Sequence, residues 1–292
     1  MALNQQAQRE QNRRSWNAVV PAHESHHVDQ AAFFRGGGST LFAEERALLG
    51  DVAGRTLAHL LCNTGQDSLS LAQLGAIVTG VDLSDSAIAS ARELSAATEL
   101  PATFVRADVY EWLRETAAGA QRFDIVYCAY GVICWLDDLQ SWARGIAAVL
   151  KPGGRFVLVE FHPASNMFDR GWRLAADYPA RGRRLALPGI GDYVGASEGG
   201  LTPSGYAEGI QDFVNPEPCY LHQWGLGEVV TALAEAGLMI TALHEYPYVN
   251  GERPFTEMRA DADRRMYPPD GVPALPLMYG LAARKPEEAH GN

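Results

Sequence analysis

The fold is decided by one stretch, residues 57–84, which reads LAHLLCNTGQDSLSLAQLGAIVTGVDLS. A short apolar run at 57–61 lies between polar residues, and such a run is typical of a buried strand. A loop of small residues follows at 62–65, and a second apolar run at 77–81 predicts a second strand. That strand delivers Asp82 at its carboxyl end, where open parallel sheets bind their ligands.

Between the two strands the sequence predicts a helix that begins at the same edge of the sheet. Asp67 or Ser68 can cap this helix, and Gly75 ends it. Free amides at the helix start, with a carboxylate that can accept both hydroxyls of a ribose, indicate a nucleoside-like ligand. The dinucleotide fingerprint needs a second and a third glycine, but this loop contains only Gly65. We therefore expect a nucleoside without phosphates.

Two further motifs complete a family pattern. They read FDIVYCAYGVICWLDDL at 123–139 and LKPGGRFVLVEFHP at 150–163. With the opening stretch, they make the chain resemble the class I S-adenosylmethionine-dependent methyltransferases. The resemblance is greatest to a bacterial small-molecule branch whose first loop reads CNxGQD instead of GCGTG. It covers 55–163 closely and 220–284 more weakly.

The resemblance implies an α/β fold, a Rossmann-like doubly wound sheet of seven strands. Most strands are expected to be parallel and the last antiparallel, with a lid and an inserted cap. The sequence pattern places the remaining strands at 103–106, 123–127, 155–161, 239–243 and 275–286. It places helices at 41–49, 84–100, 139–149 and 227–236, and a sharp turn at the KPGG of 151–154.

The resemblance also implies which residues bind S-adenosylmethionine. His59 stands where most relatives carry an acid and Asn63 replaces a glycine, so Asp67 could take over the contact to the methionine amino group. Asp108 matches the acid that holds the adenine amino group, although it could also be only a helix cap. The implied set is Leu61, Cys62, Asn63, Gly65, Asp67, Asp82, Leu83, Asp108, Val109 and Ala129.

Three residues at the ends of the fourth and fifth strands are candidates for catalysis. Tyr130 carries a phenol that can orient an acceptor or act as a weak acid or base. Glu160 and His162 are two residues apart, so they point to one side of the strand, and we expect that side to face the acceptor. His162 is the leading candidate, since its neutral form is available near pH 7. Packing of the tyrosine, and a histidine bonded to loop backbone, are the alternatives.

The chain divides into a lid at 1–50, a cofactor-binding half at 51–163, a cap at 164–222, a C-terminal part at 223–286 and a tail at 287–292. The lid holds three aromatic residues that could cover a sulfonium cation or pack as core, namely Trp16, Phe33 and Phe34. The cap is too long for a plain connection and reads as a cover over the active site, with hairpin character near GDYVGAS and GIQDFV. Its arginines at 170, 173, 181, 183 and 184 could bind an anion, but a solvated loop surface is the simpler interpretation.

Composition narrows the partners. The charge of −11 argues against nucleic acid, and no apolar run reaches the length of a membrane helix. The start of the chain has no hydrophobic signal core, which favours a cytoplasmic location. Four cysteines without CxxC spacing argue against zinc and disulfides. We also expect no metal at HESHH, 23–27, because no second half-site is visible.

The expected reaction is transfer of a methyl group from S-adenosylmethionine to N, O or C of a small metabolite, leaving S-adenosylhomocysteine. The expected enzyme is a monomer or homodimer. Two other classes stay open. One is a methyltransferase that acts on RNA or protein. The other is a cofactor-binding protein of this fold that transfers no methyl group, such as a cyclase or a regulator.

Overall fold

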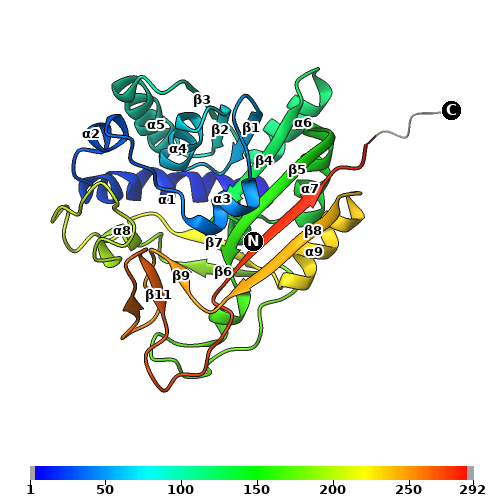
Figure 1. Cartoon of the computed structure of the whole chain (residues 1–292). Helices are drawn as coiled ribbons and strands as arrows, with labels where there is room; N and C mark the ends of the chain where they lie inside the picture. The colour runs from blue at the N-terminus through cyan, green and yellow to red at the C-terminus, as the bar shows by residue number, and fades with distance from the viewer. Residues whose placement is uncertain (1–3, 288–292) are drawn as a thin grey trace.

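A seven-stranded sheet forms the centre of the computed structural model, which describes residues 4–287. The strand order is β3-β2-β1-β4-β5-β12-β8, and β12 runs antiparallel to both of its neighbours (Figure 1). The predicted fold, with its antiparallel last strand, is confirmed. The strands are β1 Thr56–Leu60, β2 Ile77–Asp82, β3 Ala102–Arg106, β4 Phe123–Ala129, β5 Leu150–Phe161, β8 Met239–Tyr246 and β12 Met278–Arg284.

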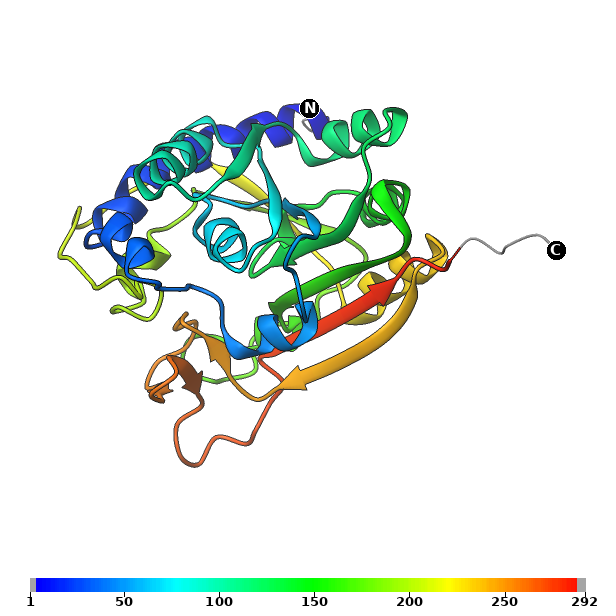
Figure 2. The same ribbon diagram turned by 45° about the horizontal axis from the view of Figure 1, so that its top comes forward.

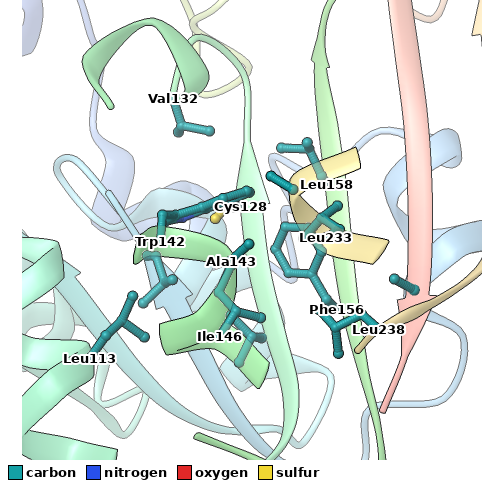
Figure 3. Packing of buried hydrophobic residues seen from close by; sticks show 14 of the residues in the cluster. Leu113, Cys128, Val132, Trp142, Ala143, Ile146, Phe156, Leu158, Leu233 and Leu238 are labelled. Carbon is teal, nitrogen blue, oxygen red and sulfur yellow. The ribbon is translucent and has the colours of Figure 1, made fainter. Parts of the chain in front are cut away.

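Helices cover both faces of this sheet. Ala58 and Leu60 of β1 pack toward one face, where α6, α7 and α9 form the larger core cluster (Figure 3). Leu57 packs toward the other face, against α3 and α4, and α5 lies beside β2 and β3. The helices are α3 Ala43–Leu49, α4 Gln66–Gln73, α5 Asp85–Thr98, α6 Val109–Ala118, α7 Leu139–Val149 and α9 Leu226–Glu235. Both faces of β1 are buried, which explains its continuous apolar sequence.

Three local predictions are wrong. The cap of α4 is Gly65 in a left-handed conformation, not Asp67 or Ser68. The KPGG segment is not a turn before the fifth strand. It is a bulge inside β5, where the register against β4 shifts and Gly153 takes a φ of 72°. GDYVGAS contains the short helix α8, Tyr193–Ala196, instead of part of a hairpin.

The remaining elements gather around one end of the sheet. Helix α1, Gln5–Ser25, lies along α5 (Figure 2). Further elements are α2 Gln30–Arg35, the strand pair β6 Arg183–Leu187 and β7 Cys219–Gln223, and a small sheet of β9 Val249–Asn250, β10 Arg259–Ala260 and β11 Arg265–Tyr267. Two short 3₁₀ turns lie at Ile133–Trp135 and Pro163–Met167. No helix within 4–287 is long and apolar enough to cross a membrane. Most of the tail predicted at 287–292 lies outside the described residues.

Side chains from the middle of α1 hold it in place. Arg13 pairs with Asp85 at the start of α5, and Asn17 accepts a hydrogen bond from Ser84 Oγ at 2.7 Å. On the other side, Asn12 Nδ2 donates to the Tyr220 carbonyl of β7 at 2.9 Å. The helix therefore bridges the sheet and the β6–β7 pair, and it forms one wall of the space between them.

Two glycines near β1 test how strictly the backbone conformation is fixed, one in the loop after the strand and one just before it. Gly65 has a φ of 80°, and a Cβ there would lie 2.7 Å from the Phe104 ring and 2.8 Å from Ala91 Cβ. Gly54 also has a positive φ, 68°, but its Cβ would meet nothing within 4 Å. Gly54→Ala should cost about 1 kcal/mol from backbone strain alone. Gly65→Ala should cost about 3 kcal/mol, because overlap adds to strain. Urea unfolding measures both, and equal losses would contradict the overlap.

Candidate functional site

A cavity of about 470 Å³ lies at the carboxyl ends of β1, β2, β3 and β4. Its other walls come from α1 and α2, from residues around α8, and from the segment that carries β9 to β11. Residues from each expected lid and cap segment thus face the cavity, while the segment boundaries themselves stay a prediction. Nine of the ten residues predicted to bind the cofactor line this cavity: Leu61, Cys62, Asn63, Asp67, Asp82, Leu83, Asp108, Val109 and Ala129.

The tenth predicted residue, Gly65, lies behind the loop and packs against Phe104. Its role is to let the chain turn. Leu61 and Asn63 also have positive φ values, 54° and 49°, so the whole loop is tightly curved. This curvature turns the loop backbone toward the cavity, where a ligand can approach it.

Asp82 ties this loop to the end of β2. Its Oδ2 accepts a hydrogen bond from the Asn63 amide at 2.9 Å, and its Oδ1 accepts one from the Ser84 amide at 2.8 Å. Both oxygens are therefore fixed in direction. Burial raises the pKa of Asp82, while these amides lower it.

Asp108 caps a helix and also lines the cavity, so its contact with adenine stays a prediction. It caps α6 by accepting hydrogen bonds from the amides of Tyr110 and Glu111, at 2.9 and 3.2 Å. It also lines the cavity, with Arg9 of α1 3.7 Å from its second oxygen. The same Arg9 stacks over the Tyr110 ring at 4.1 Å and pairs with Asp137 at 2.7 Å.

Asp67 and His59 occupy the floor of the cavity. Asp67 accepts a hydrogen bond from Thr40 Oγ1 at 2.5 Å, and burial raises its pKa. His59 Nδ1 lies 2.8 Å from Ser68 Oγ, and burial lowers its pKa to about 3, so the ring is neutral. The floor thus carries an acid at Asp67, whereas relatives are expected to have one at the position of His59.

Tyr130 lines the cavity in a strained conformation, with a φ of 41°. Its hydroxyl donates to Glu45 Oε2 at 2.9 Å and accepts from Asn250 Nδ2 at 2.9 Å. Glu45 is fully buried, and burial and the nearby Asp67 raise its pKa to about 8. Strain held in place by two hydrogen bonds is typical of functional residues.

Glu160 is not at the cavity, which corrects the expectation for this residue. Its carboxylate accepts hydrogen bonds from the amides of Gly131, Val132 and Ile133 at 2.6, 2.8 and 2.9 Å, and from its neighbour Phe161 at 2.7 Å. All of its acceptor capacity serves the backbone. Glu160 therefore holds the loop after β4 in shape and does not face an acceptor.

His162 is absent from the cavity wall for the same geometric reason. It shares a side of β5 with Glu160, and that side faces away, while Phe161 between them lines the cavity. Its Nδ1 accepts from the Ala164 amide at 3.1 Å, and its Nε2 lies 3.0 Å from the exposed Glu245. This matches the alternative of a histidine bonded to loop backbone.

The aromatic residues predicted in the lid line the cavity and also pack in hydrophobic clusters. Trp16, Phe33 and Phe34 all line the cavity, and Phe34 is also packed in the cluster around Phe104. Trp16 stands edge-on to Trp135, with ring centroids 5.3 Å apart. All three rings thus face the cavity and also pack in hydrophobic clusters, while their contact with a sulfonium cation stays a prediction.

The three histidines within residues 23–27 lie in or next to the wall of the cavity. His23 and His27 line it, and burial lowers the pKa of each to about 4. His26 Nε2 lies 2.6 Å from Asp192 at the start of α8. Among residues 4–287, no group of three or more His, Cys, Asp or Glu side chains is arranged to hold a metal.

The arginines of the cap do not line the cavity. Arg183 donates to the Gln223 side chain at 2.9 Å, and Arg184 stacks over Tyr220 at 5.4 Å. Two other arginines line it, namely Arg9 of α1 and Arg264, whose guanidinium stacks over Phe42 at 4.3 Å. Sequence reasoning missed Arg264, Glu45, Asn250 and Glu252, because no motif surrounds them.

Comparison with known proteins identifies the central segment. Residues 58–154 match the family model described as a methyltransferase domain. The chain is 35% identical over 115 residues to an uncharacterized methyltransferase of Synechocystis, covering 39% of this chain and 50% of that protein. It is 30% identical over 170 residues to the ubiquinone biosynthesis O-methyltransferase of Bordetella avium, covering 54% and 66%. The chain spans about half the length of the first curated relatives it matches.

Solved structures share the fold. One is an S-adenosylmethionine-dependent methyltransferase from Mesorhizobium loti, with 22% identity, a TM-score of 0.53, and coverage of 85% of this chain and 99% of that one. Another is the CcbJ methyltransferase from Streptomyces caelestis, with 19% identity, a TM-score of 0.55, and coverage of 94% and 99%. At these identities the likeness shows the fold alone.

The structural role of Glu160 is directly testable. Glu160→Gln replaces one acceptor oxygen by an NH₂ group that faces backbone amides. The free energy of unfolding of the protein should therefore fall by about 2–3 kcal/mol. The matched control is Glu245→Gln, since Glu245 is exposed and its side chain pairs with His162. It should change stability by less than about 0.5 kcal/mol. Urea unfolding of both variants measures this, and an unchanged Glu160→Gln protein would contradict the assignment.

Proposed function

We propose that this chain, whose residues 58–154 match a methyltransferase domain, transfers a methyl group from S-adenosylmethionine to N, O or C of a small molecule. The observation that carries the proposal is the position of Asp82. It is a fixed carboxylate at the end of β2, beside a tightly curved loop, on the wall of a cavity at the carboxyl edge of a methyltransferase-type sheet.

The residues present fit the cofactor. Asp82 would hold the ribose hydroxyls, and the Cys62–Gly65 loop would face the methionine part. Asp108 and Val109 would lie at the adenine, with Asp108 able to accept from the amino group. The Oδ1 of Asn63 is buried without a hydrogen-bond partner within 4–287, so the loop still offers an acceptor to a ligand. When bound, S-adenosylmethionine supplies an electrophilic methyl group on a good leaving group.

The enclosure of the cavity supports a small acceptor. Side chains from α1, α2, α8 and the β9–β11 segment stand around it, so the acceptor must fit beneath them. The volume is typical of small-molecule sites. The curated relatives named ubiquinone biosynthesis O-methyltransferases, and the net charge of −11, agree with a small molecule in preference to a polyphosphate backbone.

Tyr130 has a defined part in this proposal. Burial and the charge of Glu45 raise the pKa of Tyr130 well above its usual value, so it stays a phenol and does not act as a base. Its donated proton is already engaged by Glu45. Glu45 and Asn250 fix the direction of the hydroxyl, and its second lone pair is left to accept a hydrogen bond from the methyl acceptor and so to orient it. Alignment and exclusion of water supply most of the rate.

Loss of the Asp82 carboxylate should abolish cofactor binding. Asp82→Ala removes the proposed ribose ligand and also releases the Asn63 amide. We expect no detectable heat of binding for S-adenosylmethionine or S-adenosylhomocysteine by calorimetry. Glu93→Ala, an exposed acid on α5, is the control and should bind both normally. Normal affinity in the Asp82 variant would refute the assignment.

Loss of the Tyr130 hydroxyl should separate turnover from binding. Tyr130→Phe keeps the ring but removes the hydroxyl, so we expect kcat to fall about 10–100-fold, equivalent to one oriented hydrogen bond. Affinity for S-adenosylhomocysteine should not change. His162→Ala is the comparison and should leave kcat unaltered, because His162 lies outside the cavity. A Tyr130→Phe enzyme with normal kcat would remove the tyrosine from the site.

A further inference from the structure

One carboxylate in the cavity wall differs from the others. Glu252 follows β9 and lines the cavity, and no hydrogen bond or ion pair of its side chain is present within the described part of the chain. The other acids of the wall all have partners. Asp82 accepts from two amides, Asp67 from Thr40, Asp108 from the start of α6, and Glu24 from Gln30 at 2.9 Å.

The cations nearby do not neutralise Glu252. Arg253, the next residue, pairs with Glu198 at 3.0 Å on the outside. Arg264 stacks over Phe42 and donates to the Gly200 carbonyl at 3.0 Å. Burial, and to a lesser extent the charge of Glu160, raise the pKa of Glu252 to about 7. An enclosed carboxylate without a counter-charge is costly unless a ligand brings one.

A second acceptor lies two residues away. Asn250 is 2% exposed and lines the same cavity, and its Oδ1 has no hydrogen-bond partner among residues 4–287. The orientation of its amide is fixed by chemistry, because its Nδ2 donates to Glu44 at 3.1 Å as well as to Tyr130. Glu44 is paired with Arg265 at 2.7 Å and can only accept there. The oxygen, not the nitrogen, is therefore the free atom.

The Glu252 carboxylate and Asn250 Oδ1 both accept hydrogen bonds, so a ligand that satisfies them must donate hydrogen bonds. The negative charge of the carboxylate also favours a positively charged donor. Aromatic rings lie close to the same place. Burial and the charge of Glu252 both raise the pKa of Tyr193, and the Tyr193 ring lies 6.4 Å from that of Trp16. Aromatic faces attract ammonium groups. An amino group satisfies the carboxylate, the amide oxygen and the rings together.

We propose that Glu252 and Asn250 Oδ1 bind an amino group of the methyl acceptor, so that the acceptor is an amine and the methylated atom is nitrogen. This inference rests on the proposed function and narrows its substrate class. Glu252 belongs to the segment after β8, which lines the cavity together with the Asp82 and Asp108 loops. Asn250 donates to the Tyr130 hydroxyl, so this part of the site lies beside Tyr130.

The chemical step balances with these groups. The acceptor enters as an ammonium ion and gives one N–H proton to the Glu252 carboxylate, which frees the nitrogen lone pair. The N–CH₃ bond forms while the S–CH₃ bond breaks, and the bonding pair of that bond stays on sulfur. The sulfonium charge passes to the methylated ammonium product, and S-adenosylhomocysteine leaves neutral at sulfur. Glu252 later returns its proton to water.

The test compares an amine with its hydroxyl counterpart in the assembled site. Calorimetry with saturating S-adenosylhomocysteine measures 2-phenylethylamine against 2-phenylethanol, probes chosen because the cavity walls are aromatic. The wild-type protein should bind the amine at least about tenfold more tightly, as expected for a hydrogen-bonded charge. Glu252→Gln keeps the volume and should reduce that preference to less than about threefold.

The control is Glu257→Gln, an exposed acid of the same segment, which should keep the wild-type preference. Thermal unfolding of Glu252→Gln checks that the variant is folded. Equal binding of the two probes by the wild type, no binding of either, or an undiminished preference in Glu252→Gln would overturn the inference. Weakened binding of S-adenosylhomocysteine by Glu252→Gln would assign the carboxylate to the cofactor's own amino group and also overturn it.

Failure of the proposed function gives a different result. If S-adenosylhomocysteine does not bind the wild-type protein, the methyltransferase proposal fails. The amine and alcohol probes are then compared without it. A preference for the amine that depends on Glu252 would still support the amine site, and its absence would refute that site independently.

Discussion

The site depends on the two hydrogen bonds that Asp82 accepts from the backbone. One comes from the loop after β1 and the other from the residue that caps α5, so a single carboxylate joins the ends of two neighbouring strands. Because parallel strands all present their carboxyl ends at the same edge, this junction lies where the sheet binds ligands. Gly65 allows it by turning where a side chain would meet Phe104.

A second buried carboxylate does similar work on the neighbouring loop. Glu160 collects the amides of residues 131–133 and so fixes the backbone directly after Tyr130. The strained φ of Tyr130 is held from the other side by Glu45 and Asn250. Buried acids in this protein therefore act mainly as receivers of backbone and hydroxyl donors. Glu252 stands out because it receives none within the described residues, and for that reason we propose that it faces the methyl acceptor.

Sequence reasoning succeeded where the chemistry is local. The strand and helix pattern from 57 to 161 follows from contiguous stretches whose periodicity and end residues are visible, and the motifs in those stretches carry the family resemblance that implied nine residues of the cavity wall. It failed at Glu160 and His162 because a residue reaches the cavity only if it lies at the strand end and also on the side of the strand that faces the cavity. Both residues meet the first condition and not the second. Side chains alternate along a strand, and at the end of β5 the residue on the cavity side is Phe161.

The sequence by itself determined the strands, the loop that turns at Gly65 and the acid at the end of β2, since each depends on near neighbours in the chain. Only the tertiary structure decided what surrounds the ligand. Glu45, Asn250, Glu252 and Arg264 come from segments up to about 200 residues apart and meet because α3, the β9–β11 segment and the strand ends pack together. Residues joined by packing across such distances leave no periodic signal, so contacts between them appear only in the folded chain.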